Sequence, residues 1–217
     1  MNRKLINWLG ILGVISLLSY AVAVIFSPLA YPGYNWMEQA VSDLSANTAP
    51  SKELWSQLSI LYEKCGIVSI TCVCVYVCDN KISSKLFRLG IYLFAGMNWI
   101  SCIGYSLFPL SDSGKAIDTF QDIMHVYVVT VGVVLLSIVS LVLIILAGIK
   151  SKDIRTISIW AGITFIMMLI GAIGTGIVPG KYFGIVERFS VFSVAIFNAI
   201  LGIYLFLGFR HIKKIQN

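Results

Sequence analysis

The sequence predicts an all-α fold, a polytopic membrane bundle of six transmembrane helices. Charged residues make up only 12% of the 217-residue chain, against roughly 25% in a typical soluble domain. Hydrophobic residues make up 58%, and the mean hydropathy is +0.89. A soluble core of this size needs a polar shell, and these charges are too few to build one. The apolar residues are therefore expected to face lipid.

Six apolar runs are long enough to cross a hydrocarbon core of roughly 30 Å, which takes about 20 helical residues. Lipid offers no partners to backbone amides, so each run is expected to be a helix. We interpret the first run as an uncleaved helix, because it is longer than the apolar part of a signal peptide. The runs form one predicted domain, residues 1–217, and lie near residues 8–26, 58–78, 86–108, 123–149, 157–178 and 187–209.

Basic residues favour one side of the predicted membrane. That side holds 11 of the 16 lysines and arginines, but only Asp79 and Asp153 of the ten acids. By the positive-inside rule it is cytoplasmic, and both termini lie there. The net charge of +6 then reflects the orientation of the protein in the membrane rather than binding to nucleic acid. We expect a protein of the cell membrane with lipids as its partners. The basic residues are Arg3, Lys4, Lys81, Lys85, Arg88, Lys150, Lys152, Arg155, Arg210, Lys213 and Lys214.

The connection after the first predicted span, from Ser27 to about Gln57, is the longest in the chain. Apolar residues recur in it at helical spacing, and Asn35 with Glu38 resembles a capping box. We therefore expect a short interfacial helix near residues 35–45. Its polar side would carry Ser42 and Asp43, either as a solvated face or as part of a site.

The stretch from Phe108 to His125 gathers polar residues between two apolar runs. The proline after Phe108 is expected to end the third helix. Asp122 and His125 share a face of the fourth, and ionisable groups in a span tend to face the bundle interior. His125 is therefore a candidate either for function or for a structural hydrogen bond. The fourth helix is expected to begin with one of two capping boxes, Asp118 with Gln121 or Thr119 with Asp122.

Further polar residues lie in the other spans. Asn98 is expected to bond to a second helix or to contact a ligand. Glu187 suits the first turn of the last helix and shares a face with Asn198. Arg188 can pair with a lipid phosphate or with an acid from another loop.

Charges and cysteines in the second span leave alternatives open. Glu63 and Lys64 lie either within the hydrocarbon, facing a cavity or a partner, or just above it. Four of the five cysteines are on this span, without a Cys-x-x-Cys motif or a nearby histidine, so neither a metal site nor a cofactor is expected. They are interpreted as small hydrophobic residues. A disulfide between Cys65 and Cys102, at similar depth, is the alternative.

These features together resemble the bacterial and archaeal membrane-protein family called domain of unknown function nine-nine-eight, over nearly the whole chain. The resemblance rests on the six spans and on three short motifs. It implies an architecture and candidate positions but no reaction, because the family has no established activity. A more distant likeness is to Frag-one-type membrane proteins, some of them tied to lipid handling. The motifs are Ser42-Asp43-Leu44, Phe108-Pro109 leading to His125, and Glu187-Arg188; Ser45 stands where the family often has glycine.

Two classes of function follow as hypotheses. The first is binding, sensing or moving a lipid-like or small amphipathic ligand through an outward-facing polar pocket. That pocket would use Asp122, His125, Glu187 and Arg188, with Asn98 and Asn198 deeper in the bundle. The second is a membrane-embedded hydrolase or transferase with His125 as base, Asp43 or Asp122 orienting it, and Ser42 as nucleophile. The sequence lacks the common hydrolase motifs, which favours the first class. A structural or assembly role is a third alternative.

Overall fold

The computed structural model describes residues 3–112 and 117–210, and within these ranges the chain forms helices and turns without a β-strand. The predicted all-α fold is confirmed. Six helical stretches are long and apolar enough to cross a membrane, so the protein is a multi-pass membrane protein. They cover Leu5–Ala30, Lys52–Asp79, Lys85–Leu107, Phe120–Lys150, Lys152–Ile177 and Gly180–Phe206.

The first three stretches contain one long helix each. The first joins α1 (Leu5–Leu9), α2 (Ile11–Phe26) and the short 3-10 helix η1 (Ser27–Ala30). The second joins α3 (Lys52–Leu58) and α4 (Ile60–Asp79), and the third is α5 (Lys85–Leu107). As predicted, Phe108 follows the last residue of α5 and precedes a proline, which pushes its backbone out of helical geometry.

The last three stretches each open with a short element. The fourth joins α6 (Phe120–Ile123), the π-helical segment η3 (Met124–Thr130) and α7 (Val131–Lys150). The fifth joins the 3-10 helix η4 (Lys152–Ile154) and α8 (Arg155–Ile177). The sixth joins η5 (Gly180–Tyr182) and α9 (Phe183–Phe206). Because α9 begins at Phe183, Glu187 lies beyond its first turn, and the predicted first-turn position of this carboxylate is wrong.

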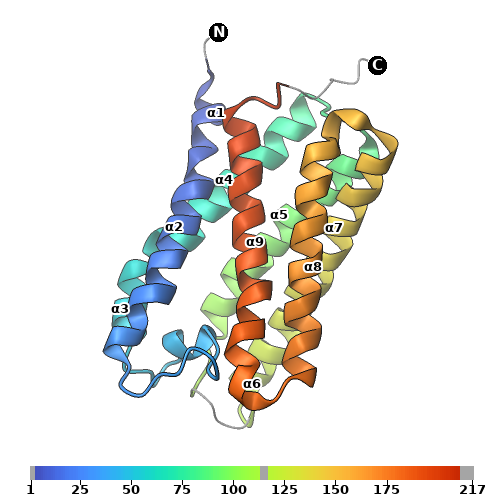
Figure 1. Ribbon diagram of the computed structural model, residues 1–217. Helices are drawn as coiled ribbons and strands as arrows, with labels where there is room; N and C mark the ends of the chain where they lie inside the picture. The colour runs from blue at the N-terminus through green and yellow to red at the C-terminus, as the bar shows by residue number, and fades with distance from the viewer. Residues whose placement is uncertain (1–2, 113–116, 211–217) are drawn as a thin grey trace.

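The long helices form a closed ring in which each packs against its neighbours (Figure 1). The order around the ring is α2, α4, α5, α7, α8 and α9, and α9 also contacts α4 across the bundle. Phe94 of α5 and Phe197 of α9 are fully buried and meet edge to face, with ring centroids 5.1 Å apart. Backbones touch where Gly10 faces Gly202, since a Cβ on either would lie 2.3 Å from the other's carbonyl oxygen.

The two ends of the bundle differ in composition. One end, where α1 begins and α9 ends, carries the connections rich in basic residues (Figure 1). The other end carries residues 27–51, the residues after α5 and the turn before α9, and we call it the loop end. Which end faces the cytoplasm stays a prediction, made from the positive-inside rule.

The interfacial helix predicted near residues 35–45 is not formed. This part of the chain consists of turns and a single 3-10 helix, η2 (Ser42–Ser45). The carbonyl oxygens of Trp36, Met37 and Gln39 accept hydrogen bonds from α9, so they do not serve amides four residues further along the loop. The apolar spacing misled the prediction because it says nothing of these bonds to α9, which hold the loop in a non-helical conformation.

Candidate functional site

A polar cluster at the loop end joins the first connection to the start of α9. The connection first makes a compact turn: Asn35 caps the amide of Met37 with its side chain, and Gln39 accepts a bond from the Asn35 amide. The chain then lies against α9, where the Gly184 amide donates to the Met37 carbonyl at 2.9 Å. We call this loop, residues 31–51, the cap loop.

Arg188 is the centre of this cluster. Its Nη1 donates to the carbonyl oxygens of Trp36, Gln39 and Gly184 at 2.7–3.1 Å, and its Nη2 donates to the Tyr34 hydroxyl at 2.8 Å. Two of the three carbonyls belong to the cap loop, 149 and 152 residues away in sequence. Arg188 therefore holds the loop on α9 through neutral oxygens.

Tyr34 extends the same network. Its hydroxyl donates to the Ala40 carbonyl at 2.8 Å while accepting from Arg188. Burial raises the pKa of Tyr34, and the neighbouring arginine offsets part of that effect. The hydroxyl thus stays protonated and able to donate at neutral pH. Tyr34 is not among the site residues predicted from the sequence, and no local signal pointed to its bond with Arg188.

Two carboxylates hold the following residues of the cap loop. Glu187 accepts a bond from the Val41 amide at 3.1 Å, and Asp43 accepts one from the Ala40 amide at 3.0 Å. Asp43 is 8% exposed, and the amides that it and Glu187 accept from belong to adjacent residues of the loop. Val41 itself packs into a small apolar cluster with Tyr20 of α2. Asp43, Glu187 and Arg188, three of the predicted site residues, therefore meet at the cap loop.

Gly184 makes this close approach of loop and helix feasible. A Cβ at this position would lie 2.3 Å from the Gln39 carbonyl oxygen and 2.5 Å from that of Trp36. Both of these atoms are backbone, and they cannot move aside as a flexible side chain would. Glycine is therefore required for the contact rather than for an unusual backbone conformation.

A second polar cluster surrounds the start of the fourth stretch. Thr119 is the N-cap of α6 and accepts from the Asp122 amide, while Asp122 accepts from the Thr119 hydroxyl at 2.5 Å. Of the two predicted capping boxes, the one of Thr119 and Asp122 has its N-cap bond in the structure, and its second bond runs from the Thr119 hydroxyl to the Asp122 carboxylate. Asp122, 5% exposed, also accepts from the Ser111 amide at 2.9 Å. Its carboxylate thus joins the helix to the residues that follow α5.

His125 is half-buried in the π-helical segment η3. Its Nδ1 lies 2.7 Å from the carbonyl oxygen of Phe108, and its ring packs on Tyr105 with centroids 4.8 Å apart. Thr130 donates to the His125 carbonyl and lies 3.0 Å from the Tyr105 hydroxyl. π-Helical turns occur often at functional sites, and no sequence pattern predicted this one.

The geometry around His125 bears on the hydrolase hypothesis. The Phe108 carbonyl rather than Asp43 lies at Nδ1, and Asp43 accepts a hydrogen bond from the Ala40 amide within the cap loop. Ser42 takes part in a local turn, in which its carbonyl accepts from the Ser45 hydroxyl. The combination of His125, Ser42 and Asp43 as catalytic residues stays a prediction. The contacts described here give His125 a structural role, as a link between α5 and the fourth stretch.

The two clusters are joined through the cap loop. The Asn47 amide donates to the Leu110 carbonyl at 2.9 Å, and the Thr48 hydroxyl donates to Asp112. The cap loop is therefore tied on one side to α9 and on the other to the residues after α5. Both clusters lie at the loop end, as the sequence predicted from their positions relative to the spans.

Two asparagines of the predicted site lie deeper in the bundle. Asn98 donates to the Phe94 carbonyl at 2.8 Å, in its own helix, and the expected bond to a second helix is not formed among the described residues. Asn198 is 4% exposed and donates to the Gly66 carbonyl of α4 at 3.2 Å. Its Oδ1 is buried without a hydrogen-bond partner among the described residues. Neither asparagine touches the Arg188 cluster through these bonds.

The structure decides one of the two alternatives left open for the second stretch, the disulfide, whereas the depth of Glu63 and Lys64 in the membrane stays a prediction. All five cysteines are free, so Cys65 and Cys102 do not form a disulfide. Lys64 and Glu63 pair with each other at 3.1 Å, and the lysine side chain is 68% exposed. In residues 3–112 and 117–210, no three metal-ligating side chains are grouped closely enough to hold an ion.

Comparison with known proteins identifies the family of the chain. The family model described as "Protein of unknown function (DUF998)" matches residues 14–204, a range that runs from α2 to α9 and includes both polar clusters. No curated protein and no solved structure matches the chain. The likeness to Frag-one-type proteins stays a prediction. The chain belongs to the DUF998 family of proteins of unknown function.

Proposed function

We propose that this membrane protein binds a lipid-like or small amphipathic ligand at the loop end, and that Arg188 holds the ligand's anionic group. One observation carries the proposal: within the part of the chain that the structure describes, all four hydrogen bonds of this arginine go to neutral oxygens. A guanidinium bonds more strongly to a phosphate or carboxylate than to carbonyl or hydroxyl oxygens. An anionic group can therefore displace the cap loop from Arg188.

The surroundings of Arg188 suit an amphipathic ligand. The arginine is partly exposed, and its guanidinium lies 6.0 Å from the ring centre of Trp36, which is itself 55% exposed. Tryptophan is the residue expected at headgroup level, where one side of the ring meets lipid and the other meets water. A headgroup on Arg188 would leave the apolar part of the ligand next to this ring and the bilayer.

The cap loop would then act as the movable part of the site. Its bonds to Arg188 are made by backbone carbonyls and one hydroxyl, and each can be exchanged for an oxygen of the ligand. Glu187 and Asp43 bond to loop amides rather than to the arginine. Ligand binding would release the Trp36 and Gln39 carbonyls while leaving the part of the loop held by Val41 in place.

The test measures binding of lysophosphatidylglycerol to the purified full-length protein by native mass spectrometry, with lysophosphatidylcholine as the zwitterionic comparison. Arg188→Gln should weaken binding of the anionic lipid about tenfold, from the lower range for a hydrogen bond to a charged group. Lys181→Gln is the matched control, because Lys181 is an exposed cation in the turn before α9. It should change the affinity less than about twofold.

A second variant separates ligand binding from loop structure. Tyr34→Phe removes one loop oxygen from Arg188 but keeps the charge. If ligand and loop compete for Arg188, it should tighten binding about fivefold, the worth of roughly one net hydrogen bond. Weaker binding in Tyr34→Phe, or unchanged binding in Arg188→Gln, would contradict the proposal.

A further inference from the structure

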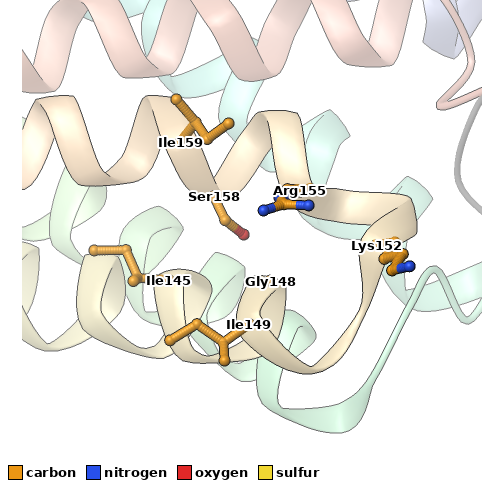
Figure 2. A pocket seen from close by; sticks show the side chains of 7 residues that line it. All are labelled: Ile145, Gly148, Ile149, Lys152, Arg155, Ser158 and Ile159. Atoms are coloured by element: carbon orange, nitrogen blue, oxygen red, sulfur yellow. The ribbon is translucent and has the colours of Figure 1, made fainter.

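A cavity of about 370 Å³ lies between α7 and α8, at the end of the bundle opposite the cap loop (Figures 1 and 2). Its size falls in the range of roughly 300–1,000 Å³ that is usual for ligand sites. The residues around it come from the end of α7, from η4 and from the start of α8. They are Ile145, Gly148, Ile149, Lys152, Arg155, Ser158 and Ile159.

The wall of the cavity includes a close contact between the two helices. Ser158 donates its hydroxyl to the Ile144 carbonyl at 2.9 Å, and a Cβ on Gly148 would lie 1.9 Å from the Ser158 hydroxyl oxygen. Figure 2 shows the Ser158 side chain between the helices, with the Arg155 guanidinium next to it and Lys152 on the connection beyond.

The cations of this cavity are available to a ligand. Lys152 and Arg155 are exposed, and neither has a hydrogen-bond or ion-pair partner among the residues that the structure describes. The connection over residues 150–155 contains three basic residues and one acid, which leaves a local charge of +2. Two of these cations line the cavity, so its open end attracts a negative group.

The rest of the cavity is apolar and reaches the lipid-facing surface. Ile149 is 77% exposed and Ile159 is 57% exposed, one on each helix, and Ile145 is partly buried between them. A free anion would use the cations but not the isoleucines. A molecule with an anionic head and a hydrocarbon tail matches both parts of the cavity.

We infer that the cavity between α7 and α8 is a binding site for an anionic phospholipid, with Lys152 and Arg155 holding its phosphate and the three isoleucines contacting its acyl chains. Basic pockets between transmembrane helices bind lipid headgroups in this way. This site is separate from the proposed one at Arg188, because the two lie at opposite ends of the bundle. The end concerned is the one predicted to be cytoplasmic.

The experiment titrates purified full-length protein with dioleoylphosphatidylglycerol or dioleoylphosphatidylcholine and counts bound lipids by native mass spectrometry. Each of Lys152→Gln and Arg155→Gln should weaken binding of the anionic lipid about fivefold, and the double variant about 25-fold. Lys85→Gln is the matched control, because Lys85 is an exposed cation at the same end of the bundle, at the first residue of α5. It should leave the affinity within twofold.

Further arms distinguish a seated lipid from simple charge attraction. Ile159→Trp enlarges an exposed side chain of the cavity wall without changing charge, and it should weaken phosphatidylglycerol binding at least fivefold. Equal losses in Lys85→Gln and Arg155→Gln would show attraction to the whole basic surface and overturn the inference. It would also be overturned by undiminished binding in the double variant, or by inorganic phosphate that competes as well as the lipid does.

Discussion

The contact between the cap loop and α9 is tested most directly by Gly184→Ala. The added Cβ would lie 2.3 Å from the Gln39 carbonyl oxygen and 2.5 Å from that of Trp36. Overpacking of this kind costs about 1–3 kcal/mol. The gain from replacing glycine by alanine is at most about 1 kcal/mol inside a helix, and it is smaller here because Gly184 is the second residue of α9. We therefore expect the loop contact to weaken by about 1–3 kcal/mol.

The assay is hydrogen exchange at the Val41 amide, which donates to Glu187 when the cap loop is in place. Exchange of such an amide reports local opening of the loop. A loss of about 1–3 kcal/mol corresponds to exchange that is roughly 5- to 150-fold faster. Amides of the buried part of α9, near Phe197, should exchange as in the unaltered protein.

Gly180→Ala is the matched control, because Gly180 begins the turn just before α9 and a Cβ there meets nothing within 4 Å. It should leave exchange at Val41 unchanged. If Gly184→Ala also left that exchange unchanged, the loop backbone would not depend on this contact, and the explanation for the missing interfacial helix would be wrong. Equal acceleration in both variants would point to the turn itself rather than to the contact.

Two further predictions concern the second cluster and the cavity wall. Asp122→Ala removes the bonds of this carboxylate to Thr119 and Ser111, so it should lower the free energy of unfolding by about 1–2 kcal/mol. Asp118→Ala should change that free energy by less than about 0.5 kcal/mol. The two variants are compared by chemical unfolding in detergent, followed by tryptophan fluorescence. Gly148→Ala should destabilise the packing of α7 on α8 by about 1–3 kcal/mol, and a second change, Ser158→Gly, should restore much of the loss. Gly162→Ala, where a Cβ meets nothing within 4 Å, should be nearly neutral, and a Gly148→Ala variant as stable as this control would contradict the proposed close contact.

The fold could be predicted because its signals are local. A span is recognised from about 20 consecutive residues and from the basic residues beside it, without knowing which helix packs on which. The end of the third helix at Phe108-Pro109 and the Thr119 cap of the fourth stretch are also local signals, and the structure forms both. Two capping boxes were left open because the residues of both have acceptable spacing. The bond of the Ser111 amide to Asp122, which favours the second box, is not part of that local spacing.

The cap loop could not be predicted in the same way, because its partners are distant in the sequence. Trp36 and Gln39 bond to Arg188, about 150 residues further along, and those bonds replace the helix that the apolar spacing favours. The position of Glu187 and Arg188 beside a span marks them as candidates in the sequence. Their partners in the cap loop could not be identified in that way. Asn98 was expected to bond to another helix, but its side-chain amide donates to a carbonyl of its own helix.

The two ends of the bundle use arginine in opposite ways, and this difference makes the proposals separable. Arg188 is already bonded to four oxygens of the protein, so a ligand must displace the cap loop to reach it. Arg155 has no such partner among the described residues, so a lipid reaches it without displacing any. Removing the charge at 188 should therefore change both ligand affinity and hydrogen exchange in the cap loop. Removing it at 155 should change lipid affinity alone, since no loop depends on that side chain.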